Sequence, residues 1–255
     1  MEKEKFVYRP FNKVFWVIVI FLVVFYGALA LILRNCTMQV KETVMLVITL
    51  CVAAYYFVYK DRLSKDKEYD KLYYSQVGGF SWWYELPFHL CNINMFLVPL
   101  GIILHNRYLQ GFAFFIGPVG AMMAILMPSI SFNNTSILKP RMRGYYITHF
   151  LITFNCLFLA VIGIYDPRYS DILPIMLVGI LLSFIIFLFN MYLRKKKIAI
   201  KANYFYTIDP EENKVLQFFH KFIPYSYLYL IPVFILFVPY MLLLTFIYQL
   251  LSGNR

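Results

Sequence analysis

The chain has 255 residues, of which 61% are hydrophobic and 15% are charged, and its formal net charge is +11. Soluble domains average about 45–50% apolar and about 25% charged residues, so a water-soluble fold of this chain would expose large apolar patches. The basic residues lie in short loops between apolar runs, which excludes a nucleic-acid-binding face and indicates contact with anionic membrane lipids. The composition therefore predicts an all-α polytopic membrane protein, with residues 1–255 as one transmembrane domain and membrane phospholipids as its partners.

Seven apolar runs are long enough to cross a hydrocarbon core of about 30 Å as helices. They cover approximately residues 14–33, 43–59, 86–104, 109–130, 145–165, 172–193 and 228–251. The first run contains an Ala-Leu-Ala sequence typical of a signal-peptide cleavage site, but it continues to Leu33 and is too long for a signal peptide, so we expect a retained helix. Pro99 and Pro118 predict local kinks in the third and fourth helices.

The distribution of basic residues predicts the orientation of these seven helices. With seven spans, 19 of the 24 Lys and Arg residues fall on the side of the N-terminus, many of them in the loops 60–71, 139–143 and 194–221. The positive-inside rule then places the N-terminus in the cytoplasm and the C-terminus outside. We expect a seven-helix, multi-pass protein of the cell membrane.

The four cysteines show no spacing that indicates a disulfide framework or a metal site. Cys36, Cys51, Cys91 and Cys156 form no CxxC pair and no zinc pattern. A free cysteine in an apolar helix is usually a small packing residue. The sequence predicts no metal ion and no cofactor.

Polar residues within the apolar runs are the candidates for function, because each costs several kcal/mol in a bilayer unless it is paired. They are Glu85, His89, Asn92 and Asn94 at the third run and His149 in the fifth. Both helices enter from the cytoplasmic side in the predicted topology, so we expect both histidines at one depth near the inner leaflet. The alternative is that these side chains only form interhelical hydrogen bonds.

Helical spacing constrains how the third run could build a site. Glu85, His89 and Asn92 follow an i, i+4, i+7 pattern and share a face, so Glu85 could accept a hydrogen bond from His89 and fix its tautomer. Cys91 lies about 200° around the helix from His89, which favours His149 as a base for Cys91. An irregular turn at Pro87 would remove this constraint.

The segment 85–91, Glu-Leu-Pro-Phe-His-Leu-Cys, resembles the core of the YwaF-type integral membrane family. That family is related to the animal transmembrane protein 164, an acyltransferase for ether phospholipids. Residues 145–149, Tyr-Tyr-Ile-Thr-His, and residues 203–206, Asn-Tyr-Phe-Tyr, also fit this resemblance, as do the chain length and the number of spans.

The resemblance implies fatty-acyl transfer between lipids, with Cys91 as the acyl-carrying nucleophile and His149 or His89 as the base. It also directs attention to Asn203 and Tyr204 as substrate-binding candidates. An amide could supply an oxyanion donor, and a basic side chain could bind the lipid phosphate. The residues considered for these last two roles are Asn92, Asn94 and Arg143.

Other functional classes remain open at this stage. The kinked third and fourth helices would suit a transporter or channel with an intramembrane polar path. A lipid hydrolase would use the same cysteine and histidine. A metal site could be built from His89, His149 and Glu85, and a nonenzymatic scaffold is a further alternative.

Overall fold

The computed structural model describes residues 6–67, 79–128, 132 and 135–253. Within this part of the chain the regular structure is helical, apart from one isolated β-bridge between Val7 and Ser136. Six of the described helices are long and apolar enough to cross a membrane. They are α1 (Lys13–Leu33), α2 (Met38–Leu63), α6 (Arg107–Leu126), α7 (Pro140–Val161), α8 (Ile172–Lys195) and α10 (Ile231–Ser252). The protein is therefore an all-α polytopic membrane protein.

The third apolar run differs from the continuous helix predicted over residues 86–104. It consists of the short α4 (Trp82–Glu85), turns over residues 86–93, and the ten-residue apolar helix α5 (Asn94–Ile103). Pro87 supplies no backbone N–H and restricts the residue before it, so Leu86 is extended with φ −59° and ψ 144°. The prediction of a helix is therefore wrong for residues 86–93.

Helix α2 is longer at both ends than the predicted run of 43–59. The side chain of Thr37 caps its first turn by accepting a hydrogen bond from the N–H of Val40. At the other end the helix continues to Leu63, so Lys60 is buried in its last turn instead of lying in the charged loop where the sequence placed it. The helix can continue because the charge of Lys60 has a buried partner, described below.

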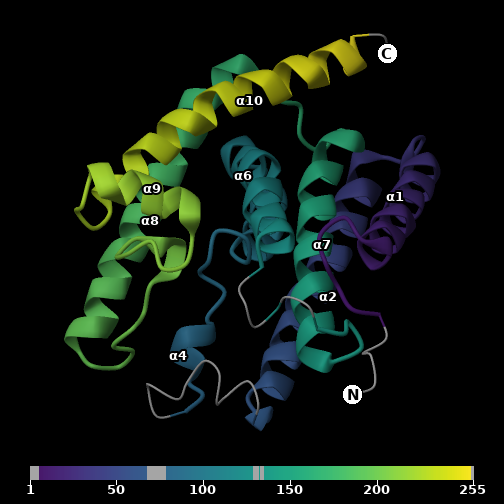
Figure 1. Ribbon diagram of the computed structural model, residues 1–255. Coiled ribbons are helices and arrows are strands. Elements are labelled where there is room, and N and C mark those ends of the chain that lie inside the picture. The colour runs from purple at the N-terminus through teal and green to yellow at the C-terminus, as the bar shows by residue number, and fades with distance from the viewer. Residues whose placement is uncertain (1–5, 68–78, 129–131, 133–134, 254–255) are drawn as a thin grey trace.

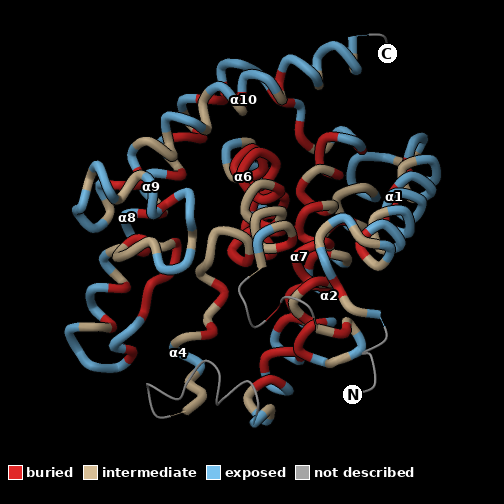
Figure 2. Tube along the Cα trace, viewed as in Figure 1, coloured by how far each residue is buried: buried red, intermediate tan, exposed pale blue. Residues whose placement is uncertain are grey.

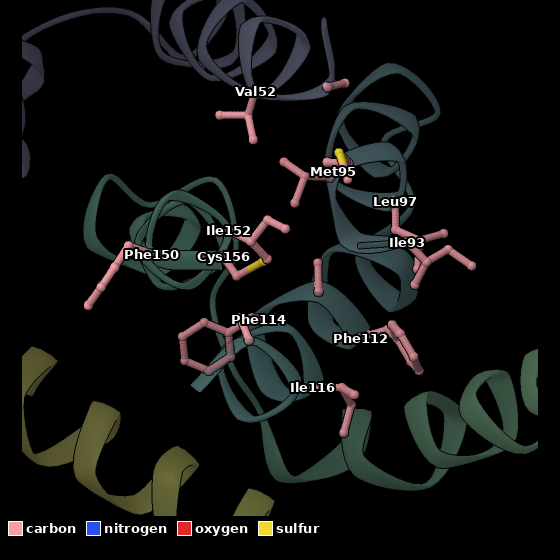
Figure 3. Packing of buried hydrophobic residues seen from close by; sticks show 14 of the residues in the cluster. Val52, Ile93, Met95, Leu97, Phe112, Phe114, Ile116, Phe150, Ile152 and Cys156 are labelled. Atoms are coloured by element: carbon pink, nitrogen blue, oxygen red, sulfur yellow. The ribbon is translucent and has the colours of Figure 1, made fainter. Parts of the chain in front are cut away.

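Helices α6 and α7 form the centre of the molecule and pack against each other (Figure 1). They are mostly buried, whereas α1 and α10 are largely exposed, as expected for helices that face lipid (Figure 2). Helix α2 packs on α7 and α5, and α8 packs on α6 from the other side. In the core, Cys156 of α7 lies beside Ile152 in the apolar cluster (Figure 3) and is 1% exposed, consistent with a packing role.

Helix α7 begins at Pro140, five residues before the predicted run of 145–165. Proline suits the first turn of a helix because its missing N–H has no partner there in any case. His149 therefore lies more than two turns into α7 and not near its start. The predicted fourth run extends to residue 130, but α6 ends at Leu126, and residues 129–130 lie outside the described residues.

The connection between α8 and α10 is folded back against α8. It contains the 3-10 turn η3 (Tyr204–Tyr206), helix α9 (Lys214–Phe222) and the turn η4 (Leu228–Leu230). Asn190 of α8 is fully buried and holds η3, because its amide nitrogen donates to the Tyr204 carbonyl at 2.8 Å and its amide oxygen accepts from the Tyr204 N–H at 3.1 Å. This contact fixes the segment that faces the candidate site.

The orientation in the membrane stays a prediction. The basic residues that support it include Lys3, Lys5, Lys71 and Arg255, which lie outside the described residues. The described helices follow the order of the seven predicted apolar runs, and the short helix α5 takes the place of the third run.

Candidate functional site

A cavity of about 1680 Å³ opens between α2, the turns at 86–93, α6, α7 and α8. Three side chains with reactive groups, His89, Cys91 and His149, line it. The side chains of Phe112, Ile116 and other residues of α6, α8 and α10 make much of the remaining wall apolar. The site therefore combines a few reactive and polar groups with an extensive apolar surface.

His149 of α7 is held in one tautomer. Its Nδ1 lies 2.7 Å from the carbonyl oxygen of Tyr145, one helical turn earlier. A carbonyl oxygen can only accept, so Nδ1 carries the proton and Nε2 of the neutral ring has a free lone pair. The ring of Tyr145 lies 4.4 Å from the imidazole, and the Tyr145 hydroxyl donates to the carbonyl of Ala124 on α6. The imidazole is thus fixed with a proton acceptor available.

His89 lies in the turns before α5 and is half-buried at the cavity wall. Its ring makes an edge contact with Tyr204 at 5.2 Å and a tilted contact with Tyr206 at 5.8 Å. Within the described part of the chain, neither ring nitrogen has a hydrogen-bond partner. Both nitrogens are therefore available to a bound molecule.

Cys91 is half-buried in the same turns and faces the same cavity. Burial raises the pKa of the Cys91 thiol, and the nearby backbone N–H of Asn92 offsets this only in part, so the thiol needs a base to lose its proton. Gly120 of α6 lets the helix approach this backbone closely, because a Cβ at that position would lie 3.2 Å from the Cys91 nitrogen. The cysteine thus sits between an irregular turn and a tightly packed helix.

Glu85 pairs with Lys60 of α2 and not with His89, which corrects the prediction from helical spacing. The Lys60 Nζ donates to the Glu85 Oε2, and the two side chains are 11% and 8% exposed. The Lys60 ammonium also lies 5.3 Å and 5.1 Å from the ring centroids of Tyr56 and Tyr59. Because α4 ends at Glu85, the i, i+4 relation between Glu85 and His89 is never formed.

Lys60 is one residue of the cavity wall that the sequence patterns did not indicate. It lines the cavity beside Glu85, and the Tyr56 hydroxyl donates to the Glu85 backbone carbonyl at 2.7 Å. The available signal was its position directly after the apolar run and one helical turn from Tyr56. A basic residue that continues an apolar helix needs a partner, and Glu85 is the nearest acidic residue at the entry of the next run.

Tyr204 links η3 to the reactive segment. Its hydroxyl donates to the Trp83 carbonyl at 2.7 Å and accepts from the Leu86 N–H at 3.1 Å. Burial raises the pKa of the Tyr204 phenol above its usual range, so the hydroxyl stays protonated and keeps its donor. Tyr204 lines the cavity, but its polar atom is used to hold the turn that leads to His89.

Asn203 also lines the cavity, and its amide is likewise engaged by the protein. The amide nitrogen donates to the Asp209 carbonyl at 2.8 Å and to the Glu211 Oε1 at 2.7 Å. Its amide oxygen accepts from the N–H of Ile208. The geometry gives Asn203 a structural role in the loop after η3.

Two other predicted binding residues lie away from the cavity. Asn94 is fully buried, does not line the cavity, and donates to the Leu90 carbonyl at 2.6 Å, which holds the turn around Cys91. Arg143 lines a separate groove. It is six residues from His149, which places the two about 120° apart around α7. The placement of both residues in a common substrate site is therefore corrected.

Asn92 and Thr148 are buried polar residues at the cavity wall. Among the described residues, the Asn92 Oδ1 and the Thr148 hydroxyl have no hydrogen-bond partner. Buried polar atoms in native proteins are usually paired, so these two are suited to contact a bound molecule. Thr148 is adjacent to His149 and was not singled out from the sequence.

The metal site considered from the sequence is not assembled. Among the described residues there is no group of three or more His, Cys, Asp or Glu side chains that could hold a metal ion. Glu85, the carboxylate of that hypothetical site, forms its ion pair with Lys60.

These features define a polytopic helical membrane protein with an internal cavity that joins apolar walls to a cysteine and two histidines. The chain belongs to the TMEM164 family, whose model matches residues 8–245 and so covers nearly the whole chain. Comparisons with curated proteins and with solved structures found no match.

Proposed function

We propose that the protein transfers a fatty-acyl group between phospholipids near the inner leaflet of the cell membrane, through a thioester on Cys91 and with a histidine as the base. The observation that carries this proposal is that Cys91, His89 and His149 open on one largely apolar cavity. The resemblance of residues 85–91 to acyltransferase relatives supports the same chemistry. A multi-pass protein offers such a site directly to membrane lipids.

The first half-reaction is attack of the Cys91 thiolate on the ester carbonyl of a donor phospholipid. A C–S bond forms and the ester C–O bond breaks, which leaves the acyl chain on sulfur as a thioester and releases the lysophospholipid alkoxide. The thiol proton passes to the histidine and from there to the alkoxide. In the second half-reaction the histidine takes a proton from an acceptor lipid hydroxyl, whose oxygen attacks the thioester and restores the thiol.

His149 is the better supported base of the two histidines. Its proton on Nδ1 is used by the Tyr145 carbonyl, so the accepting nitrogen is the one that remains free. His89 has both nitrogens available and a position on the same wall, which suits a contact to the developing oxyanion or to the headgroup. Asn92 lies at the same wall, and its amide nitrogen is the group that could donate a second hydrogen bond to that oxyanion.

The cavity has room for a lipid chain. Pockets for drug-sized ligands measure about 300–1,000 Å³, and this one is about 1680 Å³. The charge of Lys60 at its wall is already neutralised by Glu85. An apolar acyl chain that lies against this part of the wall therefore meets a cation that is already paired.

A covalent-adduct experiment tests the proposal. The purified protein in lipid micelles is incubated with an alkyne-tagged phospholipid, and the adduct is located by mass spectrometry before and after hydroxylamine. We expect a hydroxylamine-sensitive acyl group on Cys91, absent in Cys91→Ser and unchanged in the control Cys36→Ser, whose residue lies in the connection between α1 and α2. Lipid turnover by folded Cys91→Ala protein would overturn the cysteine mechanism.

The same cavity also favours a second candidate, transport of a molecule through the bundle. Helix α6, which lines the cavity, contains Pro118 in its interior, and a proline inside a membrane helix is a place where a transporter helix can bend. Proteoliposomes distinguish the two readings, because flux of a solute without any lipid turnover would favour transport. Release of free fatty acid without an acylated lipid product would instead identify a hydrolase.

A further inference from the structure

A second hollow lies on the other side of Tyr59 from the cavity. It is a groove of about 700 Å³ formed by α1, α2 and α7, and we call it the α2/α7 groove. Tyr59 lines both the groove and the cavity. The Tyr59 ring fits over Gly144, where a Cβ would lie 2.0 Å from the ring, so the side chain forms a tightly fitted wall between the two spaces.

The groove is apolar along most of its length. Helix α2 contributes residues from Val47 to Leu63, and α7 contributes residues from Pro140 to Leu151. Several of these side chains, including Val47 and Val58, are more than half exposed on the outer surface of the protein. In a membrane this face meets the lipid chains, so the groove is open to a lipid from the side.

The basic residues of the groove gather at one end. Arg62 belongs to the last turn of α2, and Arg141 and Arg143 belong to the first turn of α7. The charges of Arg62 and Arg143 both act on the hydroxyl of Tyr55, which lines the groove between them. The two guanidinium groups therefore lie on the same side of the groove as Tyr55.

Among the described residues, more positive than negative side chains line this end of the groove. They are three arginines and one acidic residue, Asp66. Arg62 and Arg143 are exposed, and within the described part of the chain neither forms an ion pair. Arg141 lines the same groove but is only 4% exposed. Arginines grouped in this way are suited to bind a phosphate by paired hydrogen bonds.

The length of the groove matches a lipid in one leaflet. From Arg62 to Ile48 the rise along α2 is about 21 Å at 1.5 Å per residue. Half of a hydrocarbon core is about 15 Å, to which the headgroup level must be added. A phosphate at Arg62 and Arg143 would thus leave an acyl chain lying along the apolar part of the groove.

We propose that the α2/α7 groove binds one phospholipid molecule, with its headgroup phosphate between Arg62 and Arg143 and an acyl chain against α2 and α7. This site is separate from the cavity that contains Cys91 and does not depend on acyl transfer. The chemical class of the ligand is a phosphodiester lipid of the leaflet on the arginine side. A neutral lipid of the same chain length lacks the anion that the arginines recognise.

Photocrosslinking of the full chain in micelles tests the site. The probe is a phosphatidylglycerol with a diazirine and an alkyne in one acyl chain, and labelled peptides are mapped by mass spectrometry. We expect labelling of the residues of α2 and α7 that line the groove. The double variant Arg62→Gln/Arg143→Gln should lower this labelling at least fivefold. A control of equal charge loss, Lys195→Gln/Lys196→Gln at the end of α8, should leave it unchanged.

Two further experiments test the apolar part of the groove and the need for a phosphate separately. Val47→Trp fills the apolar part of the groove while leaving the arginines in place, and it should also reduce labelling of the groove. A diacylglycerol probe with the same chains should label the groove at least fivefold less than the phospholipid. Equal labelling by both probes, or equal labelling of the arginine and control variants, would overturn the proposal. Cys91→Ser should not change groove labelling, which separates this test from that of acyl transfer.

Discussion

The cavity and the α2/α7 groove are two apolar spaces on either side of Tyr59, and they differ in how their charged side chains are neutralised. At the cavity wall the cation Lys60 is buried with Glu85 as its partner. In the described part of the groove three arginines line one end together with a single acidic residue. A buried cation must be neutralised by the protein itself, whereas cations at an open lipid-facing rim can be neutralised by a ligand. This difference favours a reaction site in the cavity and an anion-binding site in the α2/α7 groove.

Removal of the base in the cavity is the change with the largest expected effect. His149→Ala should lower acyl-adduct formation on Cys91 by roughly 10²–10⁴-fold, the usual contribution of a general base. Labelling of the α2/α7 groove should stay the same, because the two sites are separate. The rate of adduct formation is measured by mass spectrometry over time.

His105→Ala is the matched control for this variant, since His105 is exposed in the connection between α5 and α6. It should react at the rate of the unchanged protein. If His149→Ala also reacts at that rate, while His89→Ala is slow, the base is His89.

Removal of one partner from the buried ion pair should have the next largest effect, which is a loss of folding stability. Lys60→Met leaves Glu85 without its cation, which should lower the free energy of unfolding by about 3–5 kcal/mol. Lys65→Met is the control, because its i, i+4 partner Asp61 is exposed and such pairs contribute about 0–1 kcal/mol. Denaturant unfolding in micelles measures both values.

The double variant Lys60→Met/Glu85→Gln sharpens this prediction. Neither charge is then left buried alone, so part of the lost stability should return. No recovery in the double variant would show that packing of the Lys60 chain, and not its charge, stabilises this wall.

A change in the wall between the two spaces should have an intermediate effect. In Gly144→Ala the new methyl group would meet the Tyr59 ring, so the ring must move, at a cost of about 1–3 kcal/mol. The displaced ring should also alter lipid labelling in the groove. Thermal unfolding and crosslinking are measured on the same preparation.

Gly27→Ala is its matched control, because nothing lies within 4 Å of a Cβ at that position of α1. Alanine there should raise stability by up to about 1 kcal/mol through its helix propensity. Equal effects of the two substitutions would contradict the assignment of Tyr59 as a close-packed wall.

Loss of the Tyr204 hydroxyl should have the smallest effect on stability. Tyr204→Phe removes the hydrogen bonds to Trp83 and Leu86, and we expect a loss of about 1–2 kcal/mol, since each net hydrogen bond contributes about 0.5–1.5 kcal/mol. The readout specific to its role is adduct formation on Cys91, which should slow because the turn that leads to it is less well held. Tyr192→Phe, at an exposed position of α8, should change neither quantity.

The sequence patterns predicted the class of protein and the candidate functional residues more reliably than they predicted which residues contact one another. Six of the apolar runs form long helices, because backbone groups in a bilayer must satisfy one another. One cavity is lined by His89 and His149, which their polar character within apolar runs marked as candidates, and by Cys91, which the resemblance marked. Their catalytic roles stay a proposal. The helical-wheel argument failed at Pro87, since a helix cannot be assumed through a residue that restricts its neighbour and lacks an N–H.

Other predictions failed because they depended on the direction and depth of single side chains. Arg143 faces the groove and Asn94 faces the core, although both are close in sequence to residues of the cavity. Lys60 was assigned to a loop because a charge usually ends an apolar run. A partner 25 residues away allows the helix to continue past it.

The sequence by itself determined that this chain is helical and crosses a membrane repeatedly, since the length and apolarity of the runs leave no other way to satisfy the backbone. It also marked the polar groups that such a membrane protein must use or pair. Only the tertiary structure decided which groups are paired and which face a space. The Tyr204 hydroxyl and the Trp83 carbonyl meet across 121 residues, and such contacts depend on how the helices pack and not on any local pattern.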